Sequence, residues 1–261
     1  MNTLVKKTCR CRVVGCQSNF SFSYIRFLLL IRFYTFFLYI KETTCEQEVI
    51  KLRLHPLYVA IGDSLTVGIG STFFQPNFVK LYHRTLEAYY QTQIERRVYA
   101  RNGATTEEIR NILSQPEVAE SVSNASFITL TGGGNDFLKA GRTWMRTGDT
   151  SPIIEASQQS LIQFDQMIQR IDTLHASNPS PFIVRVLNLY NPLFYIPNTN
   201  HWLEEYTKRL TGLERYPFVR VADIYRAFSG HEPQLLGFDH IHPNPIGYRI
   251  MAQITANLGF E

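Results

Sequence analysis

Five short apolar runs, separated by helix-like stretches, constrain more than any other feature how residues 53–261 fold. The runs are Leu57–Ile61, Arg97–Ala100, Phe127–Thr131, Phe182–Leu189 and Phe218–Ala222. Several of them are rich in β-branched and aromatic residues and lack strict alternation, which is typical of strands that are covered on both faces. Strands that alternate with helices along the chain predict a doubly wound α/β domain.

Three of the intervening stretches carry helix signals. The segment Ile154–Leu174 repeats apolar residues at three- and four-residue spacing, which predicts one buried stripe. Thr105, with Glu108 three positions later, has the pattern of a capping box, so we expect a helix to start there. Asn244 followed by Pro245 predicts the start of a third helix.

Two connections are longer than simple turns. They are Phe137–Pro152, after the third apolar run, and Tyr190–Trp202, after the fourth. Both leave the carboxyl ends of predicted strands, where α/β domains bind their ligands. The second connection is rich in aromatic residues, and we expect Phe194, Tyr195 and Trp202 to line an apolar substrate pocket. The alternative is a packed surface loop with some exposed rings.

Residues 1–52 form a basic and apolar extension, which we separate from the domain expected over residues 53–261. Residues 27–40 are apolar over about the length of a signal-peptide core and follow a basic stretch. Arg32 interrupts them, and no small-residue cleavage site follows. We expect export or membrane anchoring, with membrane association through residues 27–40. If the extension comes from a misassigned start, we expect a cytoplasmic protein instead.

The net charge of +4 does not describe the predicted domain. Residues 1–53 hold nine Lys/Arg and three Asp/Glu, which leaves 17 basic and 19 acidic residues for the rest of the chain. A slightly acidic body gives no support for a nucleic-acid-binding face. All four cysteines also lie in the extension, and their spacing is not a usual zinc pattern. The sequence does not indicate an oligomeric state.

A serine and a histidine far apart in the sequence suggest nucleophilic catalysis. Ser64 directly follows the first predicted strand, where a parallel sheet opens its ligand crevice. A serine hydroxyl is a poor nucleophile until a base takes its proton. His242 is the candidate base, and Asp239, three residues earlier, is positioned to accept its Nδ1 proton. Pro243 disfavours the helical region for His242 and so keeps this residue extended.

Acyl transfer also needs hydrogen-bond donors for the developing oxyanion, and two glycine-containing segments are candidates for supplying them. Gly103, in Asn102-Gly103-Ala104-Thr105-Thr106, offers an unobstructed backbone N–H. The glycines at 132–134 permit a tight turn that presents the side-chain amide of Asn135. The simpler alternatives are an ordinary turn glycine and a loop hinge.

At this point the sequence resembles the SGNH, or GDSL-type, serine esterases and lipases. Four blocks of that family appear in order: Gly62-Asp63-Ser64-Leu65, Gly103 in Asn-Gly-Ala-Thr-Thr, Gly133-Gly134-Asn135-Asp136, and Asp239-x-x-His242-Pro243. The resemblance runs from about residue 55 to the C-terminus. The second block departs slightly, because Ala104 stands where many members carry Asp or another polar residue.

This resemblance implies a three-layer α/β/α sandwich with a five-stranded parallel sheet, of the SGNH or flavodoxin-like kind. It implies Ser64 as the nucleophile, His242 as the base and Asp239 as its partner. It also implies an oxyanion hole built from the N–H groups of Ser64 and Gly103 and from Asn135. No cofactor or metal is implied. The expected partner is a small-molecule, lipid or glycan ester.

Three alternatives stay open. Asp239, His240 and His242 have the residue types of a metal-dependent hydrolase, although no second ligand cluster stands out. A catalytically silent binding module with the same fold is another reading. Among the enzyme readings, an acyl or lipid ester is the first expectation and an acetylated glycan the second, because specificity lies in the loops.

Overall fold

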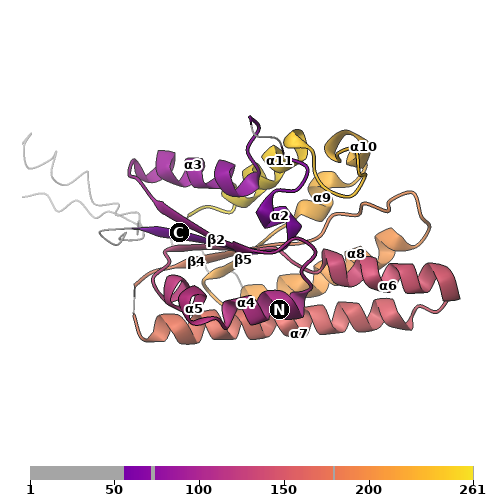
Figure 1. Cartoon of the computed structure of the whole chain (residues 1–261), viewed down its shortest axis with the longest axis horizontal. Helices are drawn as coiled ribbons and strands as arrows, with labels where there is room; N and C mark the ends of the chain where they lie inside the picture. The colour runs from indigo at the N-terminus through magenta and orange to yellow at the C-terminus, as the bar shows by residue number, and fades with distance from the viewer. Residues whose placement is uncertain (1–55, 72–73, 179, 261) are drawn as a thin grey trace, which may run out of the picture. The chain divides into compact units, whose positions relative to one another are not determined.

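The computed structural model describes residues 56–71, 74–178 and 180–260 (Figure 1). The extension expected over residues 1–52, with its apolar segment 27–40 and its cysteines, lies outside the described residues. Export, membrane anchoring and the boundary near residue 53 therefore stay predictions. Within the described ranges, no helix is long and apolar enough to cross a membrane.

All five predicted strands are present and form one parallel sheet. They are β1 (Leu57–Gly62), β2 (Glu95–Ala100), β3 (Phe127–Leu130), β4 (Ile183–Leu187) and β5 (Val219–Ala222). Their order across the sheet is β2-β1-β3-β4-β5, and every neighbouring pair is parallel. This is the flavodoxin-like order, whose connections change direction between β1 and β3. The carboxyl ends of these two strands therefore flank the ligand crevice.

Helices cover both faces of the sheet, which confirms the three-layer α/β/α sandwich (Figure 1). One layer contains α3 (Phe78–Tyr90), α9 (Ile224–Phe228), α10 (Glu232–Leu235) and α11 (Pro245–Ala256), with the short α2 (Ser64–Val67) beside them. The other contains α4 (Thr106–Leu113), α5 (Pro116–Ser123), α6 (Gly134–Thr147), α7 (Ser151–Ala176), α8 (Thr199–Leu210) and the 3-10 turn η1 (Thr211–Arg215).

The strand side chains alternate between two hydrophobic cores. Along β1, Tyr58 and Ala60 belong to the core under α3 and α11, whereas Val59 and Ile61 belong to the core over α4 and α7. Such strands read as continuous apolar runs because both faces are buried. The expectation of two covered faces is wrong for β2, an edge strand in which the side chain of Val98 is 44% exposed.

The helix starts expected from the sequence are confirmed. The Thr105 side chain accepts from the Glu108 backbone N–H, and the Glu108 side chain accepts from the Thr105 N–H. Asn244 caps α11 by accepting from two backbone N–H groups of the first turn. Phe137–Pro152, however, is not an extended connection, because most of it is helical and belongs to α6 and the start of α7.

Candidate active site

Ser64 lies at the carboxyl end of β1, on the first turn of α2. Asp63 caps this helix, because its carboxylate accepts from the Leu65 backbone N–H at 3.0 Å. The Thr131 hydroxyl, after β3, donates to the same carboxylate oxygen at 2.8 Å. Asp63 is 2% exposed, and burial raises the pKa of its carboxyl. These contacts fix the turn that carries Ser64 against the neighbouring strand.

The turn requires a glycine at position 62. A Cβ built on Gly62 would lie 2.1 Å from the Thr131 hydroxyl oxygen and 2.8 Å from the Thr131 carbonyl oxygen. Both distances are shorter than any normal contact of a Cβ atom. Only a residue without a side chain lets β1 and β3 approach this closely just before the serine.

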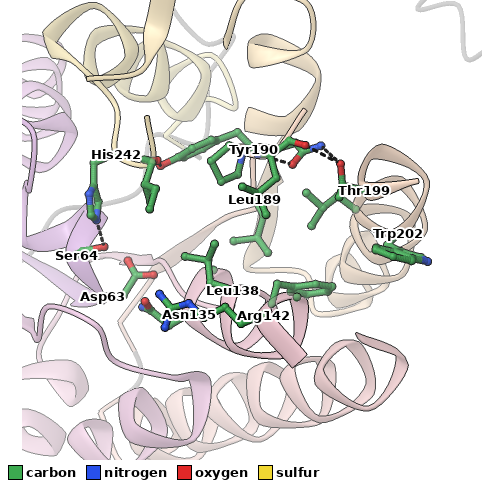
Figure 2. Close-up of a pocket in the computed structure, with 18 of the residues that line it drawn as sticks. Asp63, Ser64, Asn135, Leu138, Arg142, Leu189, Tyr190, Thr199, Trp202 and His242 are labelled. Carbon is green, nitrogen blue, oxygen red and sulfur yellow. Dashed lines mark hydrogen bonds between the residues drawn. The ribbon is translucent and has the colours of Figure 1, made fainter. Parts of the chain in front are cut away.

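The structure brings Ser64, His242 and Asp239 together from positions up to 178 residues apart. Nε2 of His242 lies 3.0 Å from the Ser64 hydroxyl oxygen, and Nδ1 lies 2.5 Å from Oδ2 of Asp239 (Figure 2). A protonated Nδ1 facing the carboxylate leaves Nε2 as an acceptor toward the serine. This is the arrangement in which an imidazole takes a hydroxyl proton.

Asp239 also shapes the loop that carries the histidine. Its Oδ1 accepts from the backbone N–H groups of Ile241 at 3.0 Å and His242 at 2.9 Å. Partial burial acts to raise the pKa of Asp239, but the hydrogen bonds from the His242 side chain and from these N–H groups outweigh it. The pKa of this carboxyl is therefore lower than its ordinary value, and the charged form is favoured.

Two tyrosines hold the segments that carry the serine and the histidine, and neither role is visible in the sequence. The Tyr190 hydroxyl, after β4, donates to the Ile241 carbonyl at 2.7 Å. The Tyr248 hydroxyl, on α11, donates to the Ile69 carbonyl at 2.5 Å. Both tyrosines are buried. One therefore secures the loop of the base, and the other secures the loop that follows the serine.

The other residues expected to donate to the oxyanion follow the ends of β2 and β3, and Asn135 lines the same cleft as Ser64 and His242. Gly103 has a φ of +75°, which residues with a side chain rarely adopt, and a Cβ built on it would meet nothing within 4 Å. Within the described part of the chain, the backbone N–H groups of Ser64 and Gly103 have no hydrogen-bond acceptor. The Asn135 amide donates to the Ala104 carbonyl at 2.9 Å, which leaves one of its two hydrogens available.

Asp136 connects the second and third sequence blocks. Its carboxylate accepts from the Thr106 backbone N–H at 3.0 Å and from the Thr106 hydroxyl at 3.1 Å. Burial raises the pKa of this carboxyl, although both hydrogen bonds oppose the shift. The contact ties the start of α4, just after Gly103, to the start of α6, where Asn135 lies.

An apolar cleft of about 230 Å³ opens from Ser64 and His242, far larger than the ~10–15 Å³ that one water molecule needs (Figure 2). One wall comes from α6, and the facing wall comes from residues 189–193 and α8. The lining side chains include Phe137, Leu138, Trp144, Met145, Ile153, Leu189, Leu193, Trp202 and Leu203. The walls of the cleft beside the serine are therefore largely apolar.

Of the three aromatic residues expected to line a pocket, the structure places only Trp202 in the cleft. It packs edge-on against Trp144 of α6, with ring centroids 4.7 Å apart. Phe194 and Tyr195 do not line the cleft, which corrects the expectation for these two residues. They pack against each other in the loop before α8, and Tyr195 is 67% exposed. Helix α6 forms most of one wall of the cleft, and this helix was not expected from the sequence.

The metal alternative also has a structural test. Across the described ranges, no group of three or more His, Cys, Asp and Glu side chains is placed to hold a metal ion. His240 follows Asp239 with a φ of +56°, while His242 is occupied by Asp239 and Ser64. The loop at 239–243 therefore aims one imidazole at the serine and does not form a metal-ligand cluster.

Comparisons with known proteins agree with this geometry. The model of the GDSL-like lipase/acylhydrolase family matches residues 60–250. The spore germination lipase LipC of Bacillus licheniformis is 34% identical over 203 residues, covering 78% of this chain and 96% of that protein. A lipase from a goat rumen metagenome is 34% identical, with a TM-score of 0.76, and the match covers 78% of this chain and 98% of that chain.

An acetyl xylan esterase from Geobacillus stearothermophilus shares the fold, with 16% identity and a TM-score of 0.57 over 79% of this chain and 95% of that one. At this identity the likeness concerns the fold alone. The family match spans most of the chain, and the two closer relatives are both lipases. The chain therefore belongs to the GDSL-like lipase/acylhydrolase family and is a hydrolase of carboxylic esters.

Proposed function

We propose that this protein hydrolyses acyl esters through an acyl-serine intermediate, with Ser64 as the nucleophile, His242 as the base and Asp239 as its orienting partner. The observation that carries the proposal is the continuous hydrogen-bonded line from Ser64 Oγ through both ring nitrogens of His242 to Asp239. It joins groups from two loops far apart in the sequence. A histidine with only a structural role would not require hydrogen bonds to both a serine hydroxyl and a carboxylate.

The chemistry then follows from proton positions. As Ser64 Oγ attacks the ester carbonyl carbon, Nε2 of His242 takes the hydroxyl proton and the ring becomes positively charged. The carboxylate of Asp239 stabilises this charge. When the carbon–oxygen bond of the ester breaks, the same proton passes to the leaving alcohol. A water molecule, deprotonated by His242, then attacks the acyl-serine ester. The bond between the carbonyl carbon and Ser64 Oγ breaks, His242 returns the proton to Oγ, and the carboxylic acid is released.

The negative oxygen that forms on the carbonyl needs donors that are already in place. The N–H groups of Ser64 and Gly103 and the free amide hydrogen of Asn135 are our assignment for this oxyanion hole. Two observations support this assignment. Both N–H groups lack acceptors among the described residues, and Asn135 lines the cleft while its amide donates to the Ala104 carbonyl. Loss of one such donor typically costs about 3–4 kcal/mol of transition-state stabilisation.

The cleft suggests which esters are used. Its walls are largely apolar, so an acyl chain that enters it exchanges water for aliphatic and aromatic side chains, a gain of about 0.8 kcal/mol per buried CH₂. An acetyl group would leave most of this surface unfilled. We therefore assign esters with longer acyl chains as substrates. Acetylated glycans serve as the contrasting substrate class.

The proposal is tested by covalent labelling and turnover. A fluorophosphonate probe is expected to label the full-length protein at Ser64, and Ser64→Ala is expected to abolish both labelling and ester hydrolysis while thermal unfolding stays cooperative. Ser114→Ala, at an exposed helix end, is the matched control and should retain both. Labelling that persists in Ser64→Ala would move the nucleophile elsewhere, and a chain that is never labelled would favour the silent binding module.

Substrate class is tested on a panel of p-nitrophenyl esters of graded acyl length, with acetylated xylan beside them. We expect kcat/KM to rise from acetyl to medium-length chains, because each added methylene is buried in the cleft. A preference for acetyl esters together with rapid release of acetate from the glycan would overturn this substrate assignment without affecting the assignment of Ser64.

A further inference from the structure

Helix α6 presents two adjacent stripes of side chains along the same length of the cleft. Residues such as Leu138 and Met145 line the cleft itself. Lys139, Arg142 and Arg146 follow at spacings of three and four residues, so they share one face of the helix next to the cleft-lining face. All three are exposed. Arg142 lies at the border and also contributes to the lining (Figure 2).

This basic stripe (Lys139, Arg142 and Arg146) has no counter-charge. Throughout the described part of the chain, none of the three side chains forms an ion pair or a side-chain hydrogen bond. By contrast, Arg101 and Arg215 are paired with Glu108 and Asp165. These three cations share one helix face beside the cleft, on a body whose residues beyond 53 hold more acidic than basic side chains.

An exposed apolar side chain lies in the wall of the same cleft, and an exposed aromatic ring follows the facing wall in the chain. Met145, on α6, lines the cleft and is 53% exposed. Tyr195, which does not itself line the cleft, comes two residues after the lining residue Leu193 and is 67% exposed. A surface that combines cations, an aromatic ring and an apolar opening has the composition of a face that binds the boundary between water and lipid.

We propose that the mouth of the cleft docks on an anionic lipid surface. The basic stripe would contact the negatively charged headgroups, Met145 and Tyr195 would enter the interfacial layer, and the cleft would open toward the acyl chains. Charge complementarity favours this occupant over a neutral lipid surface. The inference goes beyond the proposed function, because hydrolysis of a dissolved ester does not require a docking face.

The chain carries a built-in reporter for this contact. It has two tryptophans, Trp144 and Trp202, and both line the cleft. Bromine atoms on lipid chains quench tryptophan emission only at short range. Quenching therefore reports contact of the cleft mouth itself, even if the N-terminal extension also binds lipid. Full-length Ser64→Ala protein is used, so that the vesicles are not hydrolysed and the result does not depend on the proposed chemistry.

The experiment titrates this protein with vesicles of brominated phosphatidylcholine, with and without 30% phosphatidylglycerol. The test variant is Lys139→Gln with Arg146→Gln. The matched control is Lys80→Gln with Arg84→Gln, which removes the same two charges from exposed positions on α3, in the opposite helical layer (Figure 1). Each basic residue near an anionic surface contributes about fivefold to binding, so the test variant should need about 25-fold more lipid for half-maximal quenching.

The proposal requires quenching that depends on phosphatidylglycerol, weakens with added salt, and is lost in the α6 variant but kept within about twofold in the α3 variant. Equal losses in both variants would show a general charge effect and overturn it. Vesicle binding without tryptophan quenching would place the contact elsewhere on the chain, and this also overturns it. Quenching that is equal on neutral vesicles would rule out the role of the basic stripe.

Discussion

Replacing Tyr190 with phenylalanine removes one hydroxyl group from the wall of the cleft. It tests whether the hydrogen bond of this hydroxyl positions the loop that carries His242. The Tyr190 hydroxyl donates to the Ile241 carbonyl, one residue before His242, at 2.7 Å. The ring itself packs against Phe228, with centroids 4.7 Å apart, and phenylalanine preserves this contact. The substitution therefore separates the hydrogen bond from the packing.

A hydrogen bond of this kind contributes about 0.5–1.5 kcal/mol net to stability. Ile241 is only partly buried, so water can replace the lost donor, and we expect a loss of about 1 kcal/mol. For a folded body of this size, that lowers Tm by about 2–4 °C. If the same loss of about 1 kcal/mol falls on the alignment of His242 with Ser64, kcat falls about fivefold. KM should change less than about twofold, because the apolar wall is kept.

Tyr58→Phe is the matched control. The Tyr58 hydroxyl is 2.8 Å from the Thr129 hydroxyl, fully buried in the sheet and away from the cleft. It should lower Tm at least as much as Tyr190→Phe while leaving kcat unchanged. Steady-state kinetics on a soluble ester and thermal unfolding of both variants decide the matter. If the two variants lose equal stability and have equal kcat, Tyr190 does not position the base and our reasoning fails.

Asp239→Asn should reduce kcat by up to about 10⁴ while the fold is kept, as measured by ester turnover and circular dichroism, because the amide favours the wrong tautomer of His242. The pKa of Asp239 lies below its ordinary value of about 3.9, so the carboxylate partner of His242 should stay ionised as the pH falls to about 4; an NMR titration that placed the pKa of this carboxyl above that value would contradict the hydrogen bonds described for it. Gly62→Ala should lower the free energy of unfolding in urea by about 1–3 kcal/mol or more, because the added Cβ would overlap Thr131. Gly141→Ala is the control: its Cβ meets open space within a helix, so it should be neutral or raise the stability by up to about 1 kcal/mol.

The strands and the four segments that carry the expected catalytic residues could be predicted because their signals are local. A strand with two buried faces needs apolar residues throughout, and the turn after it needs small residues such as Gly62. Asn244 and Pro245 mark a helix start by capping and by a fixed φ. These features depend only on neighbouring residues, so the sequence displays them directly.

The wall of the cleft was not predicted, for physical reasons. Helix α6 begins after Gly133, which has a φ of +95° and no side chain to cap the helix, so the usual start signal is absent. Its apolar residues face an open cleft and stay partly exposed, and its other face is basic, so no buried stripe stands out as it does for Ile154–Leu174. The contact between Tyr190 and Ile241 joins residues 51 positions apart, and no local pattern encodes it.

Helix α6, which was not predicted, carries both Asn135 and much of one wall of the cleft. Asn135 lies in the first turn of α6, beside Ser64, and Met145 lies ten residues further on, about 15 Å along the axis at 1.5 Å per residue. A ligand that extends from the serine along this wall must therefore pass the α6 residues in order. Changes late in α6 can alter which esters fit, or which surface presents them, without moving Asn135. The two hydrogen bonds from Thr106 to Asp136 hold this end of α6 against the start of α4.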